Sequence, residues 1–128
     1  LSQAAFIDQI ARQVRTDEIL RKYYEDEEDW VIRKLVSNCF SAVITAQART
    51  VTKFPEDYFF RTTGFGGVAQ ALGTLVQAGI RWGDMSEPQF LKVMEKFFEL
   101  QRLPPAGVGN AAMLEIKSGI VESIRLVN

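Results

Sequence analysis

Hydrophobic residues recur at helical spacing along most of the chain, most clearly between residues 28 and 53. There the apolar side chains step alternately by three positions and by one, which places them on one stripe of a helix. The stripe comprises Ile32, Leu35, Val36, Cys39, Phe40 and Val43. The pair Phe54-Pro55 is expected to end this helix, because a residue before proline avoids helical backbone angles.

Two shorter helices are predicted before this long one. In residues 2–14, Phe6, Ile10 and Val14 are four positions apart, which indicates an amphipathic helix. Thr16 is the expected N-cap of the next helix, since acidic residues follow it directly. No glycine or proline lies between this N-cap and the end of the long helix. The second helix is therefore expected to run into the third with no more than a kink.

The middle of the chain is expected to hold an aromatic loop, residues 55–65, followed by a fourth helix over residues 66–82. Gly83 suits the left-handed position that ends many helices. Glycines inside a helix lower its stability, so the presence of Gly73 and Gly79 in this helix requires a separate explanation. They are expected to allow a close helix crossing or the approach of a ligand.

Two further helices complete the prediction. Ser86 and Gln89 have the spacing of a capping box at the start of a fifth helix. Pro104-Pro105 separates it from a sixth, in which Val108 is expected to face inward. No alternating pattern joined by a turn signal indicates a sheet. The predicted fold class is all-α, with about six helices in a globin-like or irregular helical bundle, and residues 1–128 form a single domain.

The composition favours a protein that packs and binds over an enzyme. The chain has no histidine and one cysteine. These counts exclude histidine-ligated metal or haem, Ser–His and Cys–His pairs, and an internal disulfide. Cys39 lies on the apolar stripe, so a buried, unreactive thiol is expected. No apolar run approaches the ~20 residues that span a bilayer, and a net charge of −1 argues against a nucleic-acid ligand.

Charge is polarised in the N-terminal part. Residues 1–30 carry eight acidic and four basic side chains, whereas residues 31–53 carry four basic and no acidic ones. Residues 25–29 form an acidic run. Consecutive helical residues point in different directions, so we expect a solvated or interacting surface rather than a cation site. This polarity could orient a partner or a self-complementary dimer, and an ordinary surface explains it equally well.

A candidate ligand site surrounds the predicted fourth helix. Arginines flank this helix on both sides, and aromatic side chains precede and end it. Such a pair of arginines could clamp the carboxylates of a planar ligand. The candidate residues are Tyr58, Phe59, Arg61, Arg81 and Trp82. Surface arginines and a core tryptophan are the alternative interpretation.

Residues 74–121 combine a helix ending in Gly83-Asp84, a capped helix, a Leu-Pro break and the stretch VGNAAMLEIK at residues 108–117. This succession resembles the C-terminal part of the phycobiliproteins, the globin-like light-harvesting proteins of cyanobacteria and red algae. Residues 37–55 are similar, more weakly, to the long B helix of that family and the loop after it. The resemblance implies a globin-like fold.

The chain departs from this family at the chromophore. The family attaches an open-chain tetrapyrrole to the cysteine of a Cys-x-Arg-Asp element, which falls here on residues 65–68, Phe-Gly-Gly-Val. The cysteine, the arginine and the aspartate are all absent, and Cys39 lies in another helix. No covalent cofactor is expected. A bilin held without a covalent bond remains an alternative.

Three hypotheses follow. The first is a non-pigmented, phycobiliprotein-like interaction module that takes part in phycobilisome assembly or turnover, in the cytoplasm or at the cytoplasmic face of the thylakoid. The second is a non-covalent bilin- or tetrapyrrole-binding protein that uses the candidate ligand site. The third is an unrelated helical regulatory or dimerisation domain.

Under the first hypothesis the resemblance implies where a partner binds. The N-terminal helices of the family form the subunit pair, so residues 1–30 are the candidate surface of a homo- or heterodimer, and residues 31–128 the globin-like core. Phycobilisome subunits are the expected partners. The expected interface residues are Phe6, Ile10, Glu27, Glu28 and Arg33.

Overall fold

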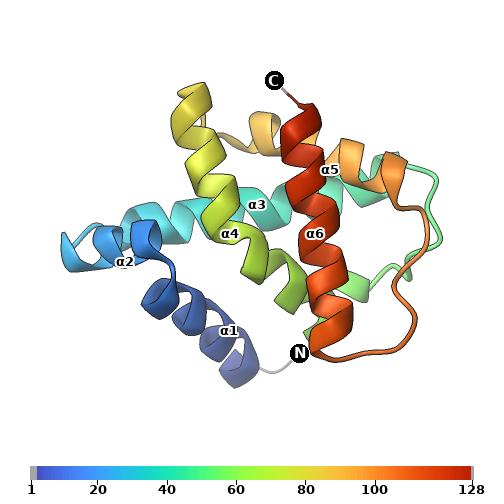
Figure 1. The fold of residues 1–128 in the computed structure, drawn as a ribbon, viewed down its shortest axis with the longest axis horizontal. Helices are drawn as coiled ribbons and strands as arrows, with labels where there is room; N and C mark the ends of the chain where they lie inside the picture. Colours follow the sequence, from blue (N-terminus) through green and yellow to red (C-terminus); the bar gives the residue numbers. More distant parts are fainter. Residues whose placement is uncertain (1–2, 128) are drawn as a thin grey trace.

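The computed structural model describes residues 3–127, and this part of the chain is all-α, without any strand. Six α-helices and a short 3-10 helix, η1 (Tyr58–Phe60), surround one hydrophobic core (Figure 1). The α-helices are α1 (Gln3–Thr16), α2 (Glu18–Glu25), α3 (Asp29–Arg49), α4 (Thr62–Trp82), α5 (Glu87–Leu100) and α6 (Asn110–Leu126). The all-α prediction is confirmed, whereas the globin-like arrangement stays a prediction.

Helix α4 forms the centre of the fold. Fourteen of its 21 residues are buried, and it packs against α1, α2, α3, α6 and η1. A helix that is apolar on nearly all sides must be covered on nearly all sides. In Figure 1, α6 runs alongside α4 and α3 crosses behind it, with α5 packed on α3.

An aromatic cluster joins the loop before α4 to α5. Phe54 and Phe59 each meet Phe98 edge to face, with ring centroids 5.5 and 5.6 Å apart. Phe97 lies beside Phe98 in the same geometry, at 5.1 Å. Edge-to-face pairs contribute about 0.5–1.5 kcal/mol beyond the area that they bury. The cluster therefore holds η1 and the start of α4 against α5.

Glycines on α4 let its neighbours approach the helix backbone. A Cβ added at Gly67 would come within 2.5 Å of the Cβ of Ile116, so Gly67 permits the close crossing of α4 and α6. A Cβ at Gly73 would collide with the carboxylate of Asp17. We expected Gly73 to allow a close crossing or a ligand, and the group that it admits is this carboxylate.

Asp17 connects the N-terminal helices to α4. Its Oδ1 accepts hydrogen bonds from the backbone amides of Ile19 and Leu20, both at 3.0 Å, and so caps α2. The predicted N-cap Thr16 is wrong by one residue. Thr16 is the last residue of α1, and its hydroxyl donates to the carbonyl of Arg12 at 2.8 Å.

Helices α2 and α3 are separate, contrary to the expected continuous helix. The Glu28 amide donates to the Tyr23 carbonyl at 2.8 Å and the Glu27 amide to the Tyr24 carbonyl at 3.2 Å. This pair of bonds is a Schellman motif. Glu27 occupies its left-handed position with φ of 57°, where glycine is usual. The sequence shows no break here because no glycine marks it.

Other boundaries also differ from the prediction. Residue 2, the predicted start of the first helix, lies outside the described residues. Helix α3 ends at Arg49, before Phe54-Pro55, and α4 begins at Thr62, four residues before the predicted start. Ser86 is the N-cap of α5, but its side chain makes no capping bond.

Two predictions about the C-terminal half have opposite outcomes. Gly83 ends α4 with φ of 67°, which confirms its predicted role. Val108 is 84% exposed, so the prediction that it faces inward is wrong. The reason is that α6 begins only at Asn110, which leaves Val108 in the preceding loop.

We predict that Gly73→Ala lowers the free energy of unfolding by about 2 kcal/mol, because the new methyl group displaces the Asp17 carboxylate from its place on α4. Chemical denaturation monitored by circular dichroism measures this change. Asp17→Ala supplies the control, because it removes the colliding group and should cost about 1 kcal/mol alone. The double variant should then lose less than the sum of the two. Additive losses would contradict the proposed contact.

We also predict that Glu27→Gly raises the free energy of unfolding by about 0.5–1 kcal/mol, since glycine relieves the left-handed conformation at this position. The same denaturation experiment on Glu27→Ala controls for the lost charge and should show no such gain. Equal stabilisation by both substitutions would mean that charge, and not backbone conformation, is responsible.

Candidate functional site

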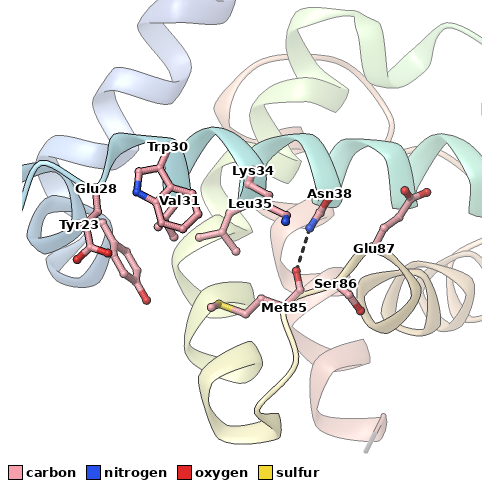
Figure 2. A pocket seen from close by; sticks show the side chains of 10 residues that line it. All are labelled: Tyr23, Glu28, Trp30, Val31, Lys34, Leu35, Asn38, Met85, Ser86 and Glu87. Carbon is pink, nitrogen blue, oxygen red and sulfur yellow. Dashed lines mark hydrogen bonds between the residues drawn. The ribbon is translucent and has the colours of Figure 1, made fainter.

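A groove opens between α3 and the turn that joins α4 to α5, and we call it the Trp30 groove (Figure 2). Its volume is about 590 Å³. It is lined by Tyr23, Glu28, Trp30, Val31, Lys34, Leu35, Asn38, Met85, Ser86 and Glu87. The lining residues come from α2 and the turn after it, from the first half of α3, and from the α4–α5 turn and the first residue of α5.

The floor of the Trp30 groove belongs to the core. Leu35 is buried, and Val31 and Met85 pack against the core from its edge. The Asn38 side-chain amide donates to the Met85 carbonyl at 3.0 Å, which ties the α4–α5 turn to α3 (Figure 2). The floor of the groove is therefore part of the core and is tied to α3 by a hydrogen bond.

Trp30 forms the exposed wall of this groove. It is 62% exposed, although tryptophan is among the side chains that gain most from burial. Tyr23 and Glu28 lie beside it at one end of the groove, and Glu87 lies at the other (Figure 2). The groove thus combines an aromatic wall and an apolar floor with carboxylates at both ends.

A second groove, the Tyr24 groove, lies on the other side of α2 and has a volume of about 730 Å³. Residues of α1, α2 and α3 line it: Ala11, Val14, Arg15, Arg21, Tyr24, Glu25, Asp29, Ile32 and Arg33. Tyr24 is 62% exposed, like Trp30.

Charges of both signs surround the Tyr24 groove. Arg21 forms an ion pair with Glu25 at 3.7 Å, and Arg33 forms one with Asp29. The hydrogen bond from Arg33 holds the pKa of Asp29 below its usual value. The ion-paired side chains leave the apolar bottom of the groove accessible between them.

The two grooves flank one structural unit, the α2–α3 corner, which we define as residues 23–34. Figure 1 shows α2 and the start of α3 at one end of the molecule, away from α5 and α6. Exposed aromatic residues beside grooves are typical of the buried centre of a protein interface. The corner thus has the exposed aromatic residues and adjoining grooves that are typical of such interfaces.

The structure does not bring the candidate ligand residues together. Arg61 precedes α4 and Arg81 lies in its last turn, so about 30 Å of helix separates them. Tyr58 and Phe59 are buried in the core, and Trp82 is half-buried against it. Arg61 pairs with Asp57 at 2.9 Å. The two arginines therefore cannot clamp a single ligand.

Some of the expected interface residues pack against other parts of the protein, and others lie at its surface. Phe6 meets the ring of Phe65 at a centroid distance of 4.6 Å and remains 40% exposed, and Ile10 packs against the core. Glu27 and Glu28 lie in the turn of the α2–α3 corner. The first two of these residues thus belong to α1, and the other two to the turn before α3. The fifth, Arg33, lines the Tyr24 groove.

The sequence reasoning missed Trp30 and Tyr24. The signal for Trp30 was present, because it lies two positions before Ile32 and hence off the apolar stripe of α3. A large aromatic residue outside the stripe of its own helix is expected to face solvent. No comparable signal marks Tyr24, whose exposure follows from how α1 and α2 pack.

Other reactive groups do not form a site in the described residues. Cys39 is fully buried, and this burial raises the pKa of its thiol, as expected for an unreactive cysteine. Within residues 3–127 no cluster of acidic or cysteine side chains could hold a metal, and no helix is long and apolar enough to cross a membrane. No known protein family, curated protein or solved structure matches the chain.

Tyr58 provides a test of the core beside α4. Its hydroxyl is buried without a hydrogen-bond partner among the described residues, and burial raises the pKa of the phenol. We predict that Tyr58→Phe raises the free energy of unfolding by about 1 kcal/mol, because it removes an unsatisfied polar group. Thermal and chemical denaturation measure the change. A loss of stability would show that the hydroxyl has a partner.

Proposed function

We propose that the chain is a protein-interaction module without enzymatic activity, and that it binds a helical partner at the α2–α3 corner. The observation that supports this most directly is the exposure of Trp30 and Tyr24, one beside each groove of the same corner. Burial of two large aromatic side chains that are exposed to water beside apolar grooves is energetically favourable, so a binding partner is expected to cover them.

The chemistry of the corner fits an interface. Tryptophan and tyrosine are enriched among the residues that contribute most to binding, and truncation of such an anchor commonly costs 2 kcal/mol or more. The polar and charged side chains around them form the rim that excludes water. Here that rim includes Glu28, Lys34 and Arg33.

The charges favour a particular orientation of the partner. Residues 25–29 place five acidic side chains at the turn, while Arg15, Arg21 and Arg33 lie around the Tyr24 groove. Arg21 is paired with Glu25 and Arg33 with Asp29, so among the described residues the unpaired carboxylates at the turn are those of residues 26–28. A partner with a basic patch facing the turn would be complementary. Such patterns set orientation and association rate more than affinity.

Phycobilisome subunits are the partners that we propose to test first, because the helix ends and breaks in residues 74–121 resemble those of the phycobiliproteins, whose chromophore cysteine the chain lacks. The proposed role is assembly or turnover of that complex at the cytoplasmic side of the thylakoid. A non-covalent bilin does not enter this proposal, since the residues expected to bind it lie at opposite ends of α4.

The test is the affinity of the purified chain for isolated phycobiliprotein subunits, measured by sedimentation velocity. We expect a complex whose Kd rises at least tenfold in Trp30→Ala, through loss of the aromatic anchor. Phe60→Ala is the matched control, because Phe60 is equally exposed, at 60%, on η1. Its Kd should change less than twofold.

Charge reversal provides a second readout. Glu27→Lys with Glu28→Lys should weaken the complex and alter its salt dependence, because the turn loses the acidic face that orients the partner. Absence of a complex with every subunit, or equal weakening by the Trp30 and Phe60 variants, would contradict the proposal.

A further inference from the structure

Two loops far apart in sequence are joined at the opposite end of α3. The Lys53 amide donates to the Arg102 carbonyl at 2.8 Å, and the Thr52 hydroxyl donates to the same carbonyl at 3.2 Å. The Arg102 guanidinium donates in return to the Val51 carbonyl at 3.1 Å. Figure 1 shows these loops side by side at the end of the molecule away from α2. The bonds make one platform of residues 49–53 and 100–103.

Aliphatic side chains project from this platform. Val51 is 84% exposed, and Leu100 and Leu103 are each more than half exposed. The hydrogen bonds between the loops bring Val51 to the chain segment that carries the two leucines. Three aliphatic side chains thus face solvent in one place, although the backbone beneath them is held by hydrogen bonds.

Cationic side chains alternate with these aliphatic ones. Arg49 and Lys53 flank Val51 at two positions on either side, and Arg102 lies between Leu100 and Leu103. All three cations are exposed, and none forms an ion pair in the described part of the chain.

Two carboxylates lie close to the platform in sequence. Glu99 is paired with Lys96 on α5 at 3.4 Å. Glu56 lies beyond Pro55 and lines a groove together with Thr50 and Thr52 of the platform, so it is one carboxylate against three cations. The platform itself is therefore positively charged.

We propose that this platform docks the protein on a membrane surface that contains anionic lipids. Val51, Leu100 and Leu103 enter the boundary between headgroups and acyl chains, and the three cations meet lipid phosphates. Apolar side chains that penetrate 5–10 Å, combined with basic residues near the surface, are how proteins bind to a bilayer without spanning it.

The arrangement fits a lipid surface better than an acidic protein. Protein interfaces are centred on aromatic side chains in pockets. The platform has no aromatic residue, and its exposed apolar side chains are aliphatic. Cationic and aliphatic residues alternate on the platform. The cations would therefore lie at the level of the lipid headgroups while the aliphatic side chains reach deeper into the bilayer.

Membrane docking and partner binding would use separate surfaces. The α2–α3 corner lies at the start of α3 and the platform at its end, so about 30 Å of helix separates them. Both surfaces can be occupied together. The membrane proposal stands or falls independently of the partner proposed above.

The experiment is flotation of the full chain with vesicles of phosphatidylcholine alone or with 30% phosphatidylglycerol, a fraction chosen as on the order of anionic content in natural membranes. We expect at least tenfold more binding to the anionic vesicles, and a loss of binding as salt is raised. Absence of binding to the anionic vesicles would overturn the proposal.

Matched variants separate the platform from general charge attraction. Val51→Asp should reduce binding at least tenfold, whereas Val108→Asp, at a valine that is also 84% exposed, should reduce it far less. Arg49→Gln with Lys53→Gln should likewise weaken binding more than Arg12→Gln with Lys22→Gln. Equal losses in the test and control variants would overturn the proposal, and circular dichroism verifies that each variant is folded.

Discussion

Neighbouring elements pack directly against the backbone of α4, and this close packing determines how the other helices are arranged. Gly67 lets α6 cross close to α4, and Gly73 makes room for the Asp17 carboxylate. A helix interior normally disfavours glycine by about 1 kcal/mol relative to alanine. In α4 this cost is offset because each missing side chain allows another element to pack where a methyl group would stand.

The position of the α2–α3 corner follows from that packing. Asp17 caps α2 and rests on α4, so the start of α2 is fixed to the core while its end projects from it. The Schellman turn at Glu27 then reverses the chain into α3. A single long helix through this region would place Trp30 elsewhere and remove both grooves. The proposed partner site thus depends on a helix cap and a turn more than on apolar periodicity.

Helix α3 connects two surfaces of different chemistry. Its first turns carry Trp30 between acidic and basic side chains, and the loop after its last turn carries Val51 among cations. Its buried stripe faces the core between them. If both proposals hold, the protein is an adaptor that keeps a helical partner about 30 Å from a membrane surface, a distance set by the length of one helix.

Periodicity predicts most of the fold and little of the candidate site. The stripe from Ile32 to Val43 identified α3, because a helix that buries one face needs apolar residues repeated at the helical period along its sequence. The break before α3 escaped prediction because Glu27 adopts a left-handed conformation through hydrogen bonds that a sequence pattern does not reveal. Arg61 and Arg81 were expected to bind one ligand together because both adjoin the same helix, but the length of that helix keeps them apart. Grooves arise from tertiary packing, so only the off-stripe position of Trp30 pointed to the site.

Hydrogen–deuterium exchange of the chain, measured with and without saturating phycobiliprotein subunits, shows whether the α2–α3 corner is the partner-binding surface. We expect slower amide exchange in residues 23–34 on binding, with exchange in residues 49–53 and 100–103 unchanged. Slower exchange confined to other parts of the chain, or no change with any subunit, would mean that the corner is not the binding surface.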